Sequence, residues 1–230
     1  MHPLDVFIGY DKTEPVAYHT CCESIITNSS RPVRITPLYL PQIKLAMPSF
    51  QSDYPPSNGF VYSRFLVPYM MQNAGKAIYL DGDMVVEGDI AELFDMPMLN
   101  VGVAVVKHDY QTSAAVKYRN AVNRDYPRKN WSSVILWNCA WYPHRLLTPS
   151  LVAASTGEYL HRFGWLTDDA IGDLPKEWNV LAGEPGQTDK PPKLIHYTLG
   201  TPCFAQYEVS PMSARWHHYR NEATRCIEFS

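Results

Sequence analysis

Two aspartates separated by one glycine follow an apolar run in the first half of the chain. Asp81, Gly82 and Asp83 come directly after Ala77-Ile78-Tyr79-Leu80 and before Met84-Val85-Val86. Glycine permits a tight turn that few other residues adopt, so both carboxylates can point into one crevice. Carboxylates this close repel each other unless a cation binds between them, and oxygen ligands suit Mg²⁺ or Mn²⁺ better than Zn²⁺. The pattern predicts a divalent-metal site, and such metals commonly complete their coordination with substrate phosphates.

A solvated surface turn is the alternative interpretation of Asp-Gly-Asp, because so short a motif also arises by chance. The apolar runs on both sides favour the metal site, since a surface turn requires neither. His196 ends a later apolar run, as Asp81 ends the first. A lone histidine in this position is more often a core or surface residue than a ligand. With the carboxylate pair, however, it completes a set of three ligands that Mn²⁺ accepts.

The elements around these residues have the pattern of an α/β fold. Leu4 to Gly9 and Val33 to Leu38 read as strands, and Glu14 to Ile26 between them has helical spacing, which together predict a β-α-β unit. The apolar run Ile78 to Leu80 predicts a strand covered on both faces, whose carboxyl end is where open α/β sheets place ligands. This half resembles a Rossmann-type nucleotide site. It lacks a Gly-x-Gly-x-x-Gly loop, which disfavours a dinucleotide cofactor.

The rest of the chain continues the alternation of helices and strands. We expect a long proline-rich connection from Pro41 to Gly59, then a helix from Phe60 to Gln72 that carries Arg64 and is kinked at Pro68. Further on we expect a helix at Ile90 to Phe94, a loop or short helix at Tyr110 to Arg128, and strands at Val101 to Val106, Ser133 to Trp137 and Lys193 to Tyr197. We also expect a helix at Glu208 to Tyr219 that packs on the core. The alternative for this last helix is that it faces a membrane surface or a partner.

Composition and charge limit the classes of function. The 230 residues suffice for one sizeable domain, and no break in composition divides them. The net charge of −3 gives no sign of a nucleic-acid partner. The five cysteines are scattered without a Cys-x-x-Cys pair, which is typical of reduced thiols and predicts no zinc site. Because no signal peptide or membrane-length apolar segment is apparent, we expect a cytoplasmic protein without a transmembrane segment.

Several short motifs occur in an order that resembles the family 8 glycosyltransferases. The motifs are Phe7-Ile8-Gly9-Tyr10-Asp11, Tyr62-Ser63-Arg64-Phe65 with Pro68, Tyr79-Leu80-Asp81-Gly82-Asp83, Asp168-Asp169, Trp178-Asn179, and His196-Tyr197-Thr198 with Gly200. The likeness extends to Phe204, and the order and spacing of the motifs are more specific than any one of them. The resemblance implies the GT-A fold, a Rossmann-like nucleotide-binding α/β fold with a mixed, mainly parallel central sheet. It also implies a nucleotide-sugar donor, usually a UDP-sugar, bound Mn²⁺, transfer with retention, and a role in glycan biosynthesis.

The resemblance also assigns roles to residues of this chain. Asp81, Asp83 and His196 would be the metal ligands, and Asp168 and Asp169 would be catalytic residues near the reacting sugar. The structural alternative for Asp168 and Asp169 is capping of a helical segment that begins after them. Residues 1–230 would form one GT-A domain, with a nucleotide-binding half at 1–106 and an acceptor-side half at 107–230. The residues that would bind the donor are Phe7, Gly9, Tyr10, Asp11, Arg64, Asp81, Gly82 and Gly200, with Tyr10 and Asp11 at the uridine and Arg64 at the phosphate or sugar.

The chain departs from the family pattern at three places. Relatives often have Asn-Ala-Gly where this chain has Trp131-Ser132-Ser133, which affects the usual sugar contacts. After Gly200 the common Lys-Pro-Trp is replaced by Thr201-Pro202-Cys203, so a customary diphosphate lysine is missing. Asp169 stands where relatives carry glutamine, and a carboxylate there could act as a nucleophile or base where an amide could only stabilise charge.

The leading hypothesis is a metal-dependent glycosyltransferase that moves a sugar from a nucleotide-sugar to an acceptor hydroxyl. A nucleotidyltransferase or metal-dependent phosphohydrolase is an alternative, because paired carboxylates also serve phosphoryl chemistry. A nucleotide-sugar-binding module that transfers nothing is the alternative from another class. The sequence identifies neither the sugar nor the acceptor, which could be a glycan, a lipid-linked molecule or a protein.

Overall fold

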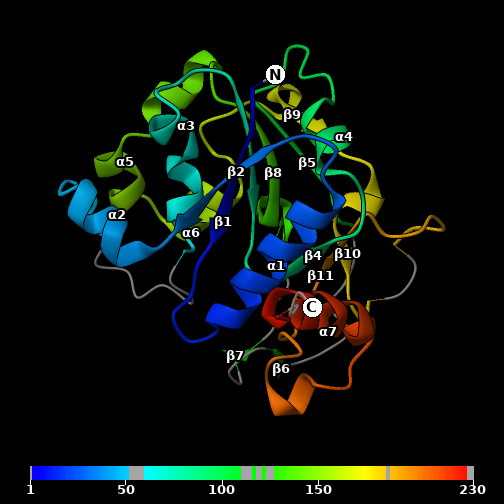
Figure 1. Cartoon of the computed structure of the whole chain (residues 1–230). Coiled ribbons are helices and arrows are strands. Elements are labelled where there is room, and N and C mark those ends of the chain that lie inside the picture. The colour runs from blue at the N-terminus through cyan, green and yellow to red at the C-terminus, as the bar shows by residue number, and fades with distance from the viewer. Residues whose placement is uncertain are drawn as a thin grey trace.

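A six-stranded sheet forms the centre of the protein, seen in this computed structural model (Figure 1). The structure describes residues 2–51, 60–109, 116–117, 121–122, 127–184 and 187–226. The strands of the sheet are β1 (Leu4–Gly9), β2 (Val33–Leu38), β3 (Lys76–Leu80), β5 (Val103–Val105), β8 (Val134–Asn138) and β9 (Ile171–Asp173). Their order is β2-β1-β3-β8-β5-β9. β1 pairs in parallel with β2 and β3, and β5 with β9, whereas β8 is antiparallel to β3 and β5. The predicted mixed, mainly parallel sheet is confirmed.

Both faces of this sheet are buried, which explains the near-continuous apolar character of its strands. In β3, Ala77 and Tyr79 pack into one core, and Ile78 and Leu80 pack into the core on the opposite face. Successive side chains of a strand point to opposite faces, so one apolar run serves both cores. All four of these side chains are fully buried. A strand of this kind is typical of a sheet with helices on both sides.

Helices close the two cores from opposite sides, as Figure 1 shows. The core that contains Tyr79 is covered by α2 (Leu40–Ala46), the 3-10 helix η1 (Ser63–Leu66), α3 (Val67–Met70), α5 (Pro149–Ala154) and α6 (Gly157–His161). The core that contains Leu80 is covered by α1 (Pro15–Asn28) and α4 (Ile90–Phe94). The result is a three-layer α/β/α arrangement, with β3 at its centre, between β1 and β8.

A second sheet has three strands, one of which begins directly after Asp81-Gly82-Asp83. Its strands are β10 (Val180–Leu181), β11 (Leu194–His196) and β4 (Met84–Val86), in that order. β11 is antiparallel to β4 and parallel to β10. The last helix, α7 (Ser213–Thr224), packs Trp216 and Tyr219 into a third core with Val85 and Ile195. The C-terminal aromatic residues therefore pack on the core, which was the favoured of the two expectations for this segment.

The connection between β2 and β3 differs from the prediction at two points. The proline-rich segment Pro41 to Gly59 contains most of α2, and its residues 52–59 lie outside the described part of the chain. The single helix predicted over Phe60 to Gln72 is instead η1 followed by α3. Pro68 lies in the first turn of α3, where the missing N–H of proline leaves no hydrogen bond unmade. The predicted kink at Pro68 is therefore wrong, because the proline marks the start of a helix.

The segment predicted as a loop or short helix at Tyr110 to Arg128 contains two short strands. These are β6 (Val116–Lys117) and β7 (Ala121–Val122), which pair with each other antiparallel. The other residues from 110 to 126 lie outside the described part. Among the residues that the structure describes, the later elements are connected by the 3-10 helices η3 (Trp131–Ser133), η4 (Tyr142–Leu146), η5 (Asp168–Ala170), η6 (Lys176–Trp178) and η7 (Ala205–Tyr207).

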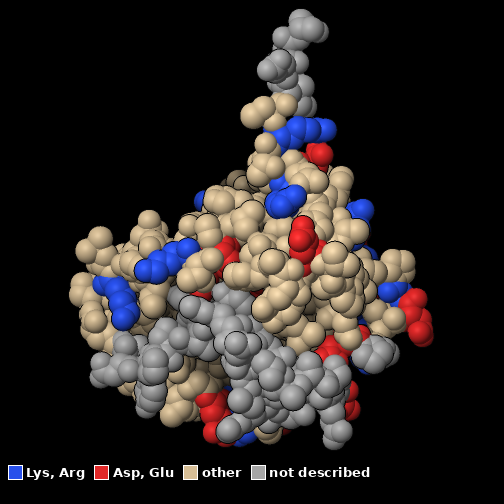
Figure 2. Space-filling view, turned by 90° about the horizontal axis from the view of Figure 1, so that it is seen from below, with Lys and Arg blue, Asp and Glu red and all other residues tan. Residues whose placement is uncertain are grey.

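The molecular surface carries charges of both signs. Figure 2 looks at the molecule from below, toward the carboxyl ends of β1 and β2, and shows Lys and Arg side chains interspersed with Asp and Glu among the described residues. Among the helices of the described part, none combines the length and the apolar character that a membrane span requires.

Candidate functional site

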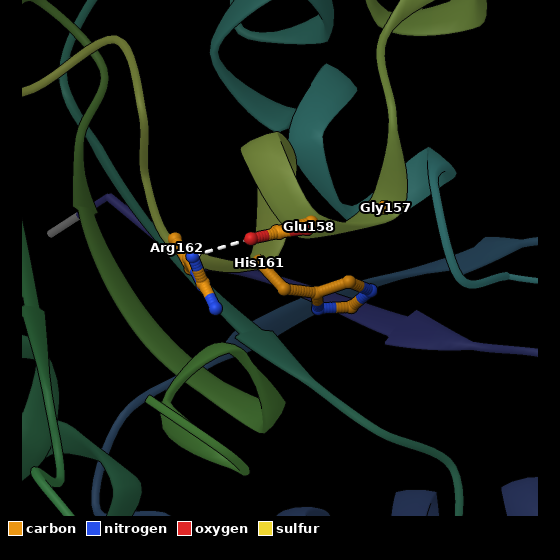
Figure 3. Close-up of a pocket in the computed structure, with 4 residues that line it drawn as sticks. All are labelled: Gly157, Glu158, His161 and Arg162. Carbon is orange, nitrogen blue, oxygen red and sulfur yellow. Dashed lines mark ion pairs between the residues drawn. The ribbon is translucent and has the colours of Figure 1, made fainter. Parts of the chain in front are cut away.

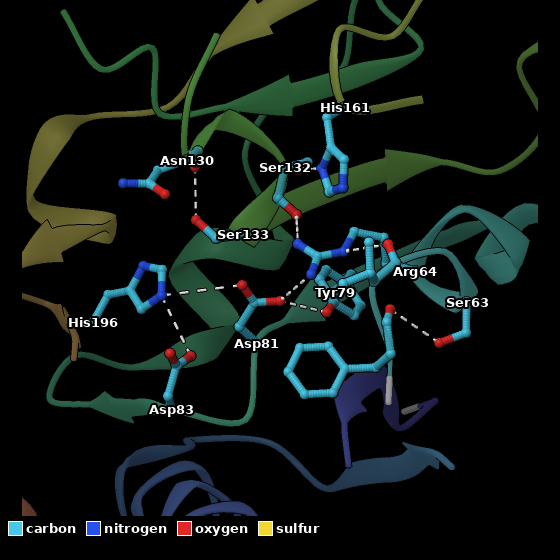
Figure 4. Close-up of polar contacts among 12 residues, drawn as sticks. Ser63, Arg64, Tyr79, Asp81, Asp83, Asn130, Ser132, Ser133, His161 and His196 are labelled. Atoms are coloured by element: carbon cyan, nitrogen blue, oxygen red, sulfur yellow. Dashed lines mark hydrogen bonds and ion pairs between the residues drawn. The ribbon is translucent and has the colours of Figure 1, made fainter. Parts of the chain in front are cut away.

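Asp81, Asp83 and His196 come together where the two sheets meet (Figure 4). Asp81 follows β3, Asp83 precedes β4, and His196 ends β11, the strand paired with β4. His196 Nε2 lies 3.3 Å from Asp83 Oδ1 and 4.0 Å from Asp81 Oδ2. One ligand atom from each residue lies within 4.8 Å of the other two. The structure thus unites the three residues that the sequence singled out as metal ligands.

Gly82, between the two aspartates, lies close against the backbone of β1. A Cβ atom at this position would lie 2.4 Å from the carbonyl oxygen of Gly9 at the end of β1, closer than real atoms approach. The Asp81 N–H donates to Ser133 O at 3.0 Å, and the Tyr197 N–H donates to Asp83 O at 3.0 Å. The backbone of the turn is therefore held on both sides, and only glycine fits between them.

Arg64 and Tyr79 hold one oxygen of Asp81. Arg64 Nη2 lies 2.9 Å from Asp81 Oδ1, and the Tyr79 hydroxyl donates to the same oxygen at 2.5 Å. Arg64 also donates from Nη1 to Ser132 O at 2.8 Å and from Nε to Val61 O at 3.1 Å. Its side chain is only 5% exposed. These contacts fix the plane of the Asp81 carboxylate and leave Oδ2 as the oxygen nearest the histidine.

The two carboxylates carry an electrostatic cost. Burial raises the pKa of Asp81, because desolvation disfavours the charged form, and the neighbouring Asp83 raises it further. Arg64, His196 and the hydrogen bond from Tyr79 oppose that rise in pKa. Asp83 Oδ1 is buried and accepts no hydrogen bond from the described residues. A buried acceptor left without a donor costs about 1–3 kcal/mol, and an oxygen-binding cation would remove that cost.

The 3-10 helix η3 connects the parts of this site through its two serines. The Ser133 carbonyl accepts the Asp81 N–H, and the Ser132 carbonyl accepts from Arg64. Ser132 Oγ lies 2.6 Å from His161 Nδ1, and the Ser133 hydroxyl donates to Asn130 O at 2.6 Å. Trp131-Ser132-Ser133 is where this chain departs from the family pattern. Its two serines connect Asp81 to Arg64, His161 and Asn130.

The residues predicted to bind the donor fall into two groups. Tyr10 is half-buried and makes edge contacts with Tyr18 and Tyr39, and Asp11 Oδ1 accepts from the backbone and hydroxyl of Thr13. The other group packs closely against neighbouring side chains. The Phe7 side chain lies in the core, a Cβ at Gly9 would lie 2.4 Å from the Phe60 ring, and Gly200 has φ +146° with a Cβ position 2.1 Å from the Tyr207 ring.

Asp168 and Asp169 lie outside the Asp81 cluster. Both belong to η5 and are exposed. Asp168 Oδ1 lies 2.5 Å from Arg128 Nη2, and the same guanidinium donates to the carbonyl of Arg162 at the end of α6. The N-cap residue of η5 is Thr167, and the two aspartates form its first turn. Arg128 therefore links Asp168 to the end of α6.

A cavity of about 260 Å³ opens beside α6 (Figure 3). The described residues that line it are Gly157, Glu158, His161 and Arg162. Glu158 and Arg162 form an ion pair across one turn of the helix. His161 connects the cavity to the site, because its Nδ1 contacts the hydroxyl of Ser132. Figure 4 shows His161 beside Ser132.

Two polar residues near the histidine ligand were not assigned a role from the sequence. Asn179 is fully buried and lies with Oδ1 3.1 Å from His196 Nδ1. His108 is half-buried near His196, and desolvation lowers the pKa of His108 to about 3, with His196 and Lys176 acting in the same direction. The Trp178-Asn179 motif was the signal that could have pointed to Asn179. No local pattern marks His108.

Comparison with known proteins agrees with this geometry. Residues 15–143 match the family Glycosyl transferase family 8. Protein CDI of Arabidopsis thaliana is 37% identical over 219 residues, covering 93% of this chain and 85% of the relative. Glycosyltransferase 8 domain-containing protein 1 of Bos taurus is 39% identical over 64 residues, 27% of this chain and 17% of the relative. The chain belongs to glycosyl transferase family 8, as its motifs indicated, and is a glycosyltransferase.

Solved glycosyltransferase structures share the fold. A structure of LgtC, mutated in its active site, superposes with a TM-score of 0.67 at 12% identity and covers 98% of both chains. GlyE of Streptococcus pneumoniae gives 0.64 at 15% identity, over 96% of this chain and 60% of GlyE. The bifunctional WbbM gives 0.60 at 20% identity, over 95% of this chain and 49% of WbbM. The chain thus spans about half of WbbM and nearly all of LgtC, and the fold is GT-A.

Proposed function

We propose that this glycosyltransferase moves a sugar from a nucleotide-sugar, with UDP-sugars as the first candidates, to an acceptor hydroxyl. The observation that carries the proposal is the cluster of Asp81, Asp83 and His196 at the carboxyl edge of the sheet, in which Asp81 and His196 are buried. Open α/β sheets bind their ligands at that edge, and hard divalent cations bind oxygen ligands together with substrate phosphates. LgtC, which shares the fold, has been crystallised with donor and acceptor sugar analogues.

The cluster fits a divalent cation, with Mn²⁺ favoured over Mg²⁺. Two carboxylates and one imidazole form a ligand set that Mn²⁺ accepts. The buried, undonated Asp83 Oδ1 supports the same assignment. Asp81, Asp83 and His196 would hold the cation, which would neutralise negative charge on a leaving nucleoside diphosphate.

Arg64 and Tyr79 hold the Asp81 carboxylate in the position in which it would bind the cation. Arg64 and Tyr79 fix Asp81 by sharing its Oδ1, so the carboxylate needs no rearrangement when a donor binds. In this role Arg64 acts on the aspartate, which adds to the donor contact expected from the family. Tyr10 and Asp11 are proposed to face the uridine, because they follow β1 at the same edge of the sheet.

Retention of anomeric configuration is proposed, with attack of the acceptor on the face that the leaving group departs from. A double displacement would need a carboxylate nucleophile, and Asp169 is the candidate that the sequence offers. Asp169 is exposed and belongs to a short 3-10 helix, whereas a nucleophile must be held in a fixed position at the reacting carbon. The exposure of Asp169 favours same-face attack over the covalent route.

The acceptor is proposed to enter from the half formed by residues 107–230, beside α6. The cavity at Glu158, His161 and Arg162 lies in that half and reaches the site through Ser132. A neighbouring carboxylate and guanidinium can accept from and donate to the hydroxyls of one sugar ring. Glu158→Gln and Arg162→Gln should then raise the acceptor KM without changing donor hydrolysis, and Glu23→Gln on α1 is the matched control.

A nucleotide-sugar screen tests the function itself. The full chain is heated with UDP-, GDP-, dTDP- or CDP-sugars, with and without Mn²⁺, and release of the sugar is measured in parallel. Metal-dependent stabilisation by one nucleotide, with slow release of its sugar, is the expected result. Tight binding with neither hydrolysis nor transfer would favour the binding-module alternative, and release of the nucleoside monophosphate would favour phosphoryl chemistry.

A further inference from the structure

The side-chain amide of Asn179, which is buried, contacts the Nδ1 side of the His196 imidazole. His196 Nδ1 lies 3.1 Å from Asn179 Oδ1, and the two side chains are 3% and 0% exposed. Asn179 Nδ2 donates to Ser133 Oγ at 3.0 Å and to Asn130 O at 3.3 Å. Buried polar groups of this kind are nearly always paired, so each contact constrains the next.

The contacts with η3 determine which way the Asn179 amide points. The Ser133 hydroxyl donates its proton to Asn130 O at 2.6 Å, so towards Asn179 it can only accept. Asn130 O is a carbonyl and also accepts only. A reversed amide would place Oδ1 against these two acceptors, which would leave buried oxygens facing each other. The NH₂ group must therefore face Ser133, and Oδ1 must face His196.

This orientation fixes the tautomer of the histidine. Because Asn179 Oδ1 can only accept, the proton of a neutral His196 lies on Nδ1. Nε2 then carries a lone pair, directed at Asp83 Oδ1 at 3.3 Å and Asp81 Oδ2 at 4.0 Å. Three electron-rich atoms facing one another are stable only with a cation between them.

We infer that Asn179 is a positioning residue, which holds His196 as the Nδ1–H tautomer and so keeps Nε2 available as a ligand for a divalent cation. The tautomer follows from the contacts alone, and the metal part rests on the proposed function. Without the amide, the imidazole could place its proton on Nε2 and donate it to Asp83 Oδ1. That hydrogen bond would occupy both ligand atoms and compete with the metal. Residues that orient a metal-bound histidine typically change metal affinity by about 10–100-fold.

Two substitutions separate this role from packing. Asn179→Leu has nearly the same volume but accepts nothing from Nδ1. Asn179→Asp keeps an oxygen for Nδ1–H, and the Ser133 hydroxyl can rotate to donate to its second oxygen. Ser132→Ala is the control within η3, because that hydroxyl contacts His161 and lies outside the Asn179 contacts. Thermal unfolding of each full-length variant shows whether it is folded.

The tautomer is measured directly in metal-free protein. Long-range ¹H–¹⁵N NMR of protein labelled at histidine nitrogen distinguishes Nδ1–H from Nε2–H at about pH 8, above the usual titration range of histidine. The His196 signal is assigned by its loss in His196→Gln. Mn²⁺ affinity is measured separately by electron paramagnetic resonance, without any substrate.

We expect the Nδ1–H form in the wild type, in Asn179→Asp and in Ser132→Ala. Asn179→Leu should shift His196 toward Nε2–H and weaken Mn²⁺ binding by about 10–100-fold, whereas Ser132→Ala should stay within about twofold of the wild type. A wild type with Nε2–H, or an Asn179→Leu variant with unchanged tautomer or Mn²⁺ affinity, would overturn the inference. Failure of the proposed function looks different, since Mn²⁺ would then bind and respond to Asn179 while no nucleotide-sugar is turned over.

Discussion

Arg64 Nη2 lies 2.9 Å from Asp81 Oδ1 in an ion pair whose two side chains are 5% and 13% exposed. Such a pair is costly to form, because both charges leave water, and far costlier to break on one side alone. The arrangement makes Asp81 both a candidate ligand and the counter-charge of a buried arginine. Asp83 carries no such second role, and this difference distinguishes the two aspartates experimentally.

Arg64→Met should lower the free energy of unfolding by about 3–5 kcal/mol, because it leaves the buried carboxylate of Asp81 without its partner. Urea unfolding of the metal-free protein measures the change. Arg34→Met is the matched control, since Arg34 pairs with Asp5 at the exposed edge of the sheet, where such a loss should have little effect. An equal effect of the two substitutions would contradict the role given to Arg64.

Asp83→Ala and Asp81→Ala should both abolish Mn²⁺-dependent donor turnover, with losses of at least about 10²-fold. They should differ in stability, because Asp81→Ala also leaves the buried Arg64 guanidinium without its ion-pair partner, whereas Asp83 is partly exposed. Sugar release and thermal unfolding of the two variants are compared with those of Asp95→Ala, which removes an exposed carboxylate far from the site. Near-normal turnover by either variant would refute the metal assignment.

Gly82→Ala should displace the turn that carries both aspartates, since its Cβ would lie 2.4 Å from Gly9 O. That contact is with backbone, which cannot move aside as a flexible side chain could. We expect a loss of stability of about 1–3 kcal/mol together with weaker Mn²⁺ binding. For comparison, Gly157→Ala meets nothing closer than 3.4 Å and should unfold like the wild type. Unchanged metal affinity in Gly82→Ala would show that the turn tolerates movement.

Stability should fall as the pH is lowered from about 6.5 to about 4, with a contribution from His144. This side chain is fully buried, with Nε2 3.0 Å from Gly102 O and Nδ1 accepting from the Trp165 indole. Burial lowers the pKa of His144 to about 4. The unfolded chain therefore takes up this proton first as the pH falls, and the native state loses stability until its own pKa is reached. Replacement by glutamine should reduce the slope of unfolding free energy against pH by about one proton, measured by denaturant titrations across this range.

Asp169→Gln should retain donor turnover within about tenfold, because same-face attack does not need a carboxylate at this position. A loss above about 10³-fold, with accumulation of a covalently modified wild-type protein, would instead establish a double displacement. Intact-protein mass spectrometry during donor hydrolysis detects such an intermediate. Asp168→Asn reports separately on the Arg128 ion pair.

The sequence by itself determined the elements whose signals are local. β1, β2 and α4 begin and end where their apolar runs and turn residues predicted, and Asp81 follows its strand as expected. Asp81 and His196 could be grouped in advance because each ends an apolar run, and Asp83 because one residue separates it from Asp81. The antiparallel pairing of β11 with β4 is what brings His196 to the two aspartates. The need for glycine between the aspartates has a different reason from the one the sequence suggested: Gly82 is not among the positive-φ glycines, and a Cβ there would lie 2.4 Å from Gly9 O on another strand.

Tertiary structure decided how these side chains are oriented. Arg64 reaches Ser132 across 68 positions of sequence, and Asn179 reaches Ser133 across 46. No periodic pattern in the sequence reveals such contacts. They depend on how η1, η3 and η6 pack against the sheet and not on the residues that neighbour Arg64 and Asn179 in the sequence. Phe7 packs into the core and Gly200 lies close to the Tyr207 ring, contacts that their positions in the sequence do not reveal. The spacing of residues along the chain thus determined which groups reach the site, and packing between distant segments determined the atom that each one presents.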